Sequence, residues 1–153
     1  MREILFRGKR LDNGEWVEGN LVRAVDNFDE TEHFFITVAG ADKLPKNEFV
    51  WFHEVDPETV GQYTGLIDKD GKRIFEGDLC DMSILGKDHT LQKIVIRYGA
   101  FGFEPVHPNK VHPEDRGWQS FWRNEHQDMW FPDFFTVIGN IHDNPELLGG
   151  DNA

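Results

Sequence analysis

The sequence predicts a mainly β protein built from two small β modules, and three observations support this. Turns of the Asn-Gly and Asp-Gly type separate short segments rich in β-branched and aromatic residues. Aromatic residues make up 13% of the chain, so burial can offset the entropy that ordering costs. Only the window that starts near Trp118 has the apolar spacing of a helix. We therefore expect strands, short helical turns and at most one amphipathic helix.

Residues 1–61 are predicted to form the N-terminal module. Asn13-Gly14 supplies the positive φ that a tight hairpin turn needs. The stretch 26–33 carries four acids and no lysine or arginine, which predicts a solvated loop. A capped turn ends the module, with Asp56 as N-cap and Pro57 at the first helical position. The expected strands of this module are 4–10, 16–22, 34–38 and 48–55.

Residues 62–148 are predicted to form the C-terminal module, and residues 149–153 a frayed tail. Gly77-Asp78 precedes an apolar strand, an arrangement typical of small SH3-like barrels, where the glycine permits a sharp bend. We therefore expect an SH3-like barrel, with a Trp-rich insert at 104–133. Its other expected strands are 62–67, 72–75, 91–98 and 134–141.

The Trp-rich insert contains the single helical pattern of the chain. Its large side chains recur three and four residues apart, which predicts an amphipathic helix laid over the sheet. Dense aromatic residues also suit a packed loop, so both interpretations stay open. The residues of the pattern are Trp118, Phe121, Trp122, His126, Met129 and Trp130.

Charge and cysteine content exclude several functional classes. Sixteen Lys and Arg against twenty-eight Asp and Glu give a net charge of −12, which argues against a general nucleic-acid coat. The single cysteine, Cys80, excludes an intrachain disulfide and a multi-cysteine zinc site, and we expect it to be a buried thiol. No apolar run reaches the length of a membrane span and no signal-type block begins the chain. We therefore expect a cytoplasmic protein that does not associate with membranes.

Several segments together resemble the YopX family of small proteins encoded by phages and prophages. The resemblance implies a mostly β protein of a mobile genetic element, located in the cytoplasm of a bacterial host. It implies no reaction and no catalytic residue. The segments that carry it are 1–10, 55–66, 70–78 and 138–148, which include Gly61-Gln62-Tyr63-Thr64-Gly65, Glu76-Gly77-Asp78 and Ile138-Gly139-Asn140-Ile141-His142-Asp143-Asn144.

Histidines and acids of the insert are candidate metal ligands. Imidazole and carboxylate groups hold zinc or manganese where a fold gathers them, which would suit a metal-dependent hydrolase. Their spacing matches no established helix motif such as H-E-x-x-H, so histidines at the surface or in packing contacts are the ordinary interpretation. We expect no cofactor, since no glycine loop of a phosphate-binding type is present. The candidate ligands are His107, His112, Asp115, His126 and Asp128.

The N-terminal hairpin is locally basic within an acidic chain. Arg7, Lys9 and Arg10 could contact phosphates, which makes nucleic-acid binding an alternative function. The net charge opposes it, and nearby acids such as Asp12 and Glu15 can pair with these cations. Salt-bridged strand edges are the ordinary interpretation.

Aromatic residues of the second module are the candidate contacts for a partner. Exposed, they would mark a protein interface, whereas buried they would complete the core. These residues are Trp118, Trp122 and Trp130, with Phe101 and Phe103 beside a turn.

These observations favour a non-catalytic binding module over an enzyme. The expected partner is a host or phage protein, or a second copy of this chain, since strand edges and spare aromatic groups need to be covered.

Overall fold

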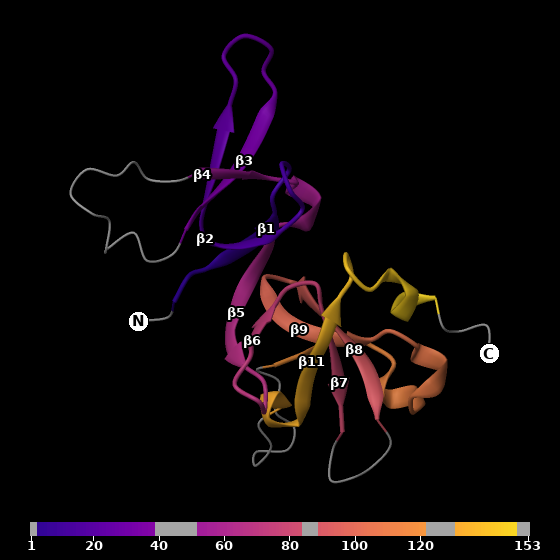
Figure 1. Ribbon diagram of the computed structural model, residues 1–153. Helices are drawn as coiled ribbons and strands as arrows, with labels where there is room; N and C mark the ends of the chain where they lie inside the picture. Colours follow the sequence, from indigo (N-terminus) through magenta and orange to yellow (C-terminus); the bar gives the residue numbers. More distant parts are fainter. Residues whose placement is uncertain (1–2, 39–51, 84–88, 122–130, 150–153) are drawn as a thin grey trace. The chain divides into compact units, whose positions relative to one another are not determined.

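The structure, a computed structural model, describes residues 3–38, 52–83, 89–121 and 131–149 (Figure 1). This part of the chain contains eleven strands in two antiparallel sheets, with five short 3-10 turns and no α-helix. The prediction of a mainly β fold is confirmed. The chain divides into two compact units, Met1–Tyr63 (unit 1) and Thr64–Ala153 (unit 2). The modules expected at 1–61 and 62–148 stay a prediction, because compactness alone does not show that each part folds independently.

Unit 1 is an antiparallel sheet in the order β4-β3-β2-β1, and the first residues of β5 pair with β1. The second strand runs past its predicted end at Val22, because residues 22–25 pair with residues 32–35 of the third. The prediction of a loop over 26–33 is therefore wrong for its last two residues, which lie in a strand. The strands are β1 (Phe6–Lys9), β2 (Trp16–Val25), β3 (Glu32–Val38), β4 (Phe52–Val55) and β5 (Gly61–Ile67).

The sheet of unit 1 curls until β4 meets the end of β1. Arg10 and Val55 form an isolated bridge, and the backbone N–H of Asp56 donates to the carbonyl of Lys9 at 2.8 Å. The turn η2 (Pro57–Thr59) follows, and the Asp56 side chain accepts from the N–H of Glu58 at 3.0 Å, so the predicted N-cap is confirmed. The buried hydrophobic side chains in the described part of unit 1 are Leu5, Ile36, Val55 and Tyr63.

Unit 2 contains a five-stranded sheet in the order β10-β9-β8-β7-β11. In the part of unit 2 that the structure describes, the edge strands β10 and β11 do not pair, so the sheet is open and the expected SH3-like barrel is not confirmed. The strands of this sheet are β7 (Asp78–Met82), β8 (Thr90–Arg97), β9 (Ala100–Pro105), β10 (Gln119–Ser120) and β11 (Phe135–Asn140). Strand β6 (Arg73–Phe75) instead follows β5 at the end of the other sheet. The turns are η3 (Pro108–Lys110), η4 (Pro113–Asp115), η5 (Phe131–Phe134) and η6 (Pro145–Leu148).

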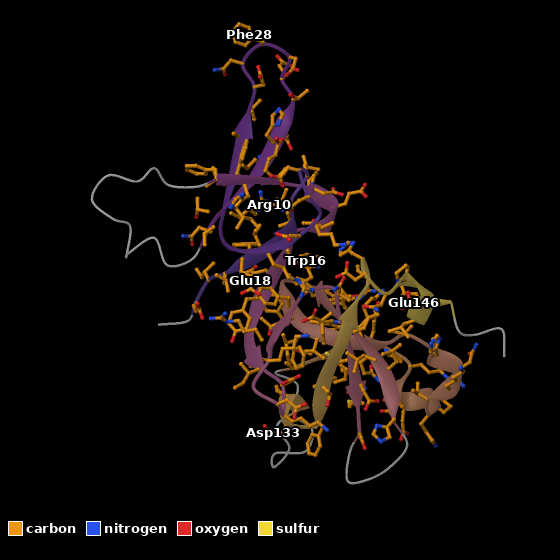
Figure 2. All side chains as sticks on the ribbon, viewed as in Figure 1. Arg10, Trp16, Glu18, Phe28, Asp133 and Glu146 are labelled. Carbon is orange, nitrogen blue, oxygen red and sulfur yellow. The ribbon has the colours of Figure 1, made fainter. Side chains whose placement is uncertain are left out.

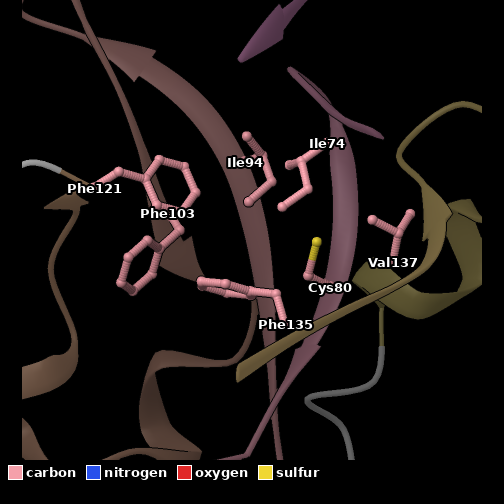
Figure 3. Close-up of a cluster of buried hydrophobic side chains, with 7 residues drawn as sticks. All are labelled: Ile74, Cys80, Ile94, Phe103, Phe121, Phe135 and Val137. Carbon is pink, nitrogen blue, oxygen red and sulfur yellow. The ribbon is translucent and has the colours of Figure 1, made fainter. Parts of the chain in front are cut away.

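A cluster of aromatic and aliphatic side chains forms the core of unit 2 (Figure 3). Three of its rings contact one another, and the Phe103 ring centroid lies 5.0 Å from that of Phe135 and 5.3 Å from that of Phe121. Cys80 is fully buried beside Ile94, which confirms the prediction of a buried thiol. Aromatic rings dominate this core because each buries a large apolar area and packs edge to face with its neighbours.

The described start of the predicted amphipathic helix is a strand. Gln119 pairs with Phe103 and Ser120 with Gly102, so β10 extends the sheet at the point where the helix was expected to begin. Phe121 then enters the core. Strand pairing and ring packing, both set by tertiary contacts, therefore explain the large residues at 118 and 121. Trp122, His126, Met129 and Trp130, the other residues of the pattern, lie outside the described residues.

Candidate functional site

The candidate metal ligands are not gathered in the described part of the chain. No group of three or more His, Cys, Asp or Glu side chains there is placed to hold a metal ion. His112 precedes η4 and pairs with Glu114, with 3.4 Å between its Nδ1 and the carboxylate Oε1, while His107 precedes the separate turn η3 and Asp115 ends η4. His126 and Asp128 lie outside the described residues.

The buried acid Asp68 serves the fold. Its Oδ1 accepts from the backbone N–H groups of Asp70 and Lys72, each at 2.9 Å. Its Oδ2 accepts from the backbone N–H of Val137, also at 2.9 Å, on the edge strand β11. The carboxylate therefore orders the 68–71 turn and also ties it to a strand edge that would otherwise be open.

A second set of hydrogen bonds orders the end of β11. The Asn140 side-chain Oδ1 accepts from the N–H groups of His142 and Asp143 at 3.0 and 2.9 Å. The Asn144 Oδ1 accepts from the N–H of Asn140 at 3.2 Å, and a Cβ at Gly139 would lie 2.2 Å from that oxygen. This segment carries part of the family resemblance, and these contacts give it a structural role.

The Lys and Arg side chains of the basic hairpin of unit 1 contact other side chains of the same hairpin. Lys9 lies opposite Trp16, and the Lys9 Nζ and the Arg7 Cζ are 5.6 and 4.8 Å from the centroid of the indole. Arg10 donates to both carboxylate oxygens of Asp12, at 2.8 and 2.5 Å. This pairing raises the pKa of Arg10 and lowers that of Asp12. Nucleic-acid binding through Arg7, Lys9 and Arg10 stays a prediction.

The β2–β3 hairpin beyond Val22 and Phe35, which we call the arm, extends away from the core of unit 1 (Figure 1). The last four residues of β2 are all exposed. The arm carries four acids against the single arginine Arg23, which forms a salt bridge with Glu32 across the hairpin. Because residues 22–25 are exposed, this end of β2 adds nothing to the core and is accessible to other molecules.

Hydrogen bonds within the tip give the arm a defined end. The Asp26 Oδ1 accepts from the N–H of Phe28 at 2.7 Å, and the Asp26 carbonyl accepts from the N–H of Glu30 at 3.0 Å. The Asp29 Oδ1 accepts from both the N–H and the hydroxyl of Thr31, at 2.9 and 2.6 Å. These side-chain contacts are the kind that Asp makes in tight turns.

Phe28 is the outstanding residue of the tip, where it is 99% exposed (Figure 2). The hydrogen bonds around it fix its backbone while its ring contacts water. The sequence prediction missed this residue because it treated the acidic stretch as solvated throughout. A single aromatic residue between acids, in a stretch with no other large apolar residue until Phe34, was the available signal.

His33 connects the arm to the neighbouring strand. Its Nδ1 lies 2.6 Å from the Glu54 Oε1 of β4, and its Nε2 lies 3.0 Å from the Thr31 hydroxyl. The hydrogen bond with Glu54, together with the charges of Glu54, Asp26 and Asp29, raises the pKa of His33 above its ordinary value. The base of the arm is thus fixed by a pair whose strength depends on the charge of the imidazole.

Among the described aromatic residues predicted to contact a partner, Trp118 is half-buried and lies against an exposed ring. Its ring meets Tyr98 edge to face at 5.9 Å, and Tyr98 is 96% exposed. Gly102 leaves the space for the indole, since a Cβ there would lie 2.5 Å from the ring. Phe103 is 1% exposed, which removes it from any surface, and Phe101 packs partly buried against the core. Trp122 and Trp130 lie outside the described residues.

Tyr98 adopts an uncommon backbone conformation. It forms the two-residue turn between β8 and β9 with Gly99, and the two φ angles are +54° and +74°. This is the left-handed region, which glycine and asparagine tolerate and in which a bulky residue such as tyrosine is disfavoured. Glycine or asparagine at this position would therefore make the turn more stable than Tyr98 does. Backbone strain of this kind is found at functional sites.

Comparison with family models shows the family of the chain, and comparison with solved structures shows a similar fold. The family described as YopX protein matches residues 5–149 of the chain. The crystal structure of protein EF1440 from Enterococcus faecalis is similar, with a TM-score of 0.50 and 22% identity over 97% of this chain and 99% of that chain. A search of curated proteins gave no match. No helix in the described residues has the length and apolar character needed to span a membrane.

Proposed function

The chain belongs to the YopX family, and we propose that it is a non-catalytic binding module that docks on a protein partner through the arm. The observation that carries this proposal is the exposure of Phe28, 99%, at the end of a hydrogen-bonded hairpin. Aromatic residues contribute much of the binding energy at protein interfaces, and they do so best when the free protein already holds them in place. The arm presents an exposed aromatic ring, and its hydrogen bonds order the backbone on either side of that ring.

Single exposed apolar residues are common on protein surfaces, so the setting of Phe28 matters more than its exposure. At the tip, the side chains of Asp26 and Asp29 accept hydrogen bonds from the backbone and so order it on either side of this ring.

The resemblance to phage and prophage proteins supports a partner in the bacterial cytoplasm, either a host protein or another product of the mobile element. Tyr98 and Trp118 are a second candidate contact, favoured by the unusual backbone of Tyr98. A strained exposed aromatic residue is retained where its side chain is needed.

Capture from a bacterial lysate by tagged protein tests the arm. The wild type should retain at least one protein that Phe28→Ser retains at a level roughly tenfold lower or less, because burial of a Phe ring corresponds to at least that change in affinity. Ile4→Ser is the matched control, since Ile4 is 66% exposed and lies outside the arm. Equal recovery of every captured protein by Phe28→Ser and wild type would contradict the proposal.

A further inference from the structure

The charges of the arm indicate what kind of surface Phe28 contacts. Four acids lie between Asp26 and Glu32, and the single arginine of the arm, Arg23, pairs with Glu32, which leaves the other three acids without a lysine or arginine in the arm. Asp29 and Glu30 directly follow Phe28, and Asp26 precedes it by two residues. Any surface that buries the ring must therefore face several carboxylates as well, and a surface that offered them no cations would have to desolvate them without compensation.

We infer that the arm binds a cationic protein surface, in which an apolar depression for Phe28 is surrounded by Lys and Arg side chains. This inference rests on the proposed function and specifies the chemistry of the partner. The ring supplies the apolar contact, and the carboxylates around it supply charge complementarity, which raises the association rate and excludes acidic surfaces.

A second copy of this chain does not fit that description. Each copy has a net charge of −12, so two copies repel one another. The cations gathered on the basic hairpin already contact groups of their own unit, since Arg7 and Lys9 lie over Trp16 and Arg10 is bidentate with Asp12. A partner of different composition, rich in lysine and arginine, satisfies the charges of the arm.

A pair of synthetic peptides tests this chemistry on the full chain. One is a labelled amphipathic helix of Lys and Leu, about 18 residues or five turns long, which presents an apolar stripe flanked by cations. The other carries Glu in place of Lys. We expect fluorescence anisotropy to show binding of the Lys peptide and none of the Glu peptide. Binding of both with equal affinity, or of neither, overturns the inference.

Variants test where the peptide binds and separate the apolar contribution of Phe28 from the contribution of the carboxylates. Phe28→Ser should weaken binding of the Lys peptide by roughly 10- to 100-fold, whereas Leu11→Ser, at a position 58% exposed in the same unit, should leave it unchanged. Glu30→Lys should weaken binding several-fold more than Glu58→Lys, which makes the same change of charge on η2. Equal effects within either pair show non-specific attraction to an acidic protein and overturn the inference.

Salt distinguishes failure of this inference from failure of the proposed function. Affinity for the Lys peptide should fall steeply between about 0.1 M and 1 M NaCl, where the Debye length decreases from roughly 10 to 3 Å. A protein captured from lysate that depends on Phe28 but not on salt would keep the arm as a docking element while overturning the cationic partner.

Discussion

At the scale of single residues, Gly139 leaves the space that the Asn144 side chain needs in the turn after β11. A Cβ at this position would lie 2.2 Å from the Asn144 Oδ1 and 2.7 Å from its Cγ. We expect Gly139→Ala to lower the free energy of unfolding by roughly 1–3 kcal/mol, because the side chain that orders the turn must move. Urea denaturation measures this. Gly117→Ala is the control, since no atom lies within 4 Å of a Cβ there; equal midpoints for both variants would contradict the expectation.

Tyr98 provides a second test at this scale. Its φ of +54° favours Asn over Ala once the ring has been removed, because Asn tolerates the left-handed conformation. We therefore expect Tyr98→Asn to be more stable than Tyr98→Ala by about 1 kcal/mol. Both variants lose the contact with Trp118, so thermal or urea unfolding of the pair isolates the backbone contribution. An alanine variant as stable as the asparagine variant would refute this explanation.

Predictions about single residues succeeded where the local sequence determines the geometry. Asp56 before Pro57 is a local capping pattern, and the structure contains that cap. The position of Phe103 depends instead on its register opposite Ile94, which directs its ring into the core. The exposure of Phe28 depends on how far a hairpin extends beyond the core. Neither property can be derived from neighbouring residues, so sequence reasoning kept Phe103 as a candidate contact for a partner and missed Phe28.

At the scale of elements, the base of the arm should respond to pH through His33. The imidazole binds its proton more tightly in the folded chain, where Glu54 accepts its hydrogen bond. Its contribution to stability is therefore complete below the unfolded pKa, about 6.5. It is lost as pH rises through the higher folded value.

The melting temperature of wild type should exceed that of His33→Gln by a larger margin at about pH 6 than at about pH 8.5. Glu54→Gln should remove most of this pH dependence, because it removes the main partner of the imidazole. A difference between wild type and His33→Gln that stays constant with pH would show that the pair is not charged in the folded protein.

Hairpins were predictable where the residues of their turns indicated them. Asn13-Gly14 and the Asp68–Gly71 turn mark hairpins that the structure contains. The arm required pairing of residues 22–25 with 32–35, which no local signal indicates, because an acidic composition says only that a segment is exposed. The helical spacing that begins at Trp118 failed over its described residues for a related reason, since large residues at that spacing can also pack from a strand and a turn.

At the scale of the whole molecule, the charge predicts how the purified protein behaves. A net charge of −12 opposes association of identical chains. We expect sedimentation velocity at about 0.1 M salt, where the Debye length is roughly 10 Å, to show one species with the mass of a single chain. A stable dimer under these conditions would contradict this expectation and would revive the interpretation that the exposed aromatic residues cover each other in an oligomer.

Family and fold class were predictable at this scale because their signals extend along the chain. The YopX match covers residues 5–149. Two of the segments that indicated it contain hydrogen bonds from a backbone N–H to a side chain, from Phe75 to Asp78 and from His142 to Asn140. Function left no comparable pattern. The side chains around Asp68 and Asn140 serve the fold, and the proposed docking residue is a lone aromatic group on a loop.

The tie between Asp68 and Val137 also bears on how the protein is made. The last strand, β11, pairs with β7 and receives this carboxylate from a residue far earlier in the chain. A growing chain on the ribosome cannot complete the second unit until residues 135–140 have left the exit tunnel. A premature stop codon before residue 135 would release a product in which the hydrophobic core around Cys80 is exposed. We expect cellular proteases to degrade such a product.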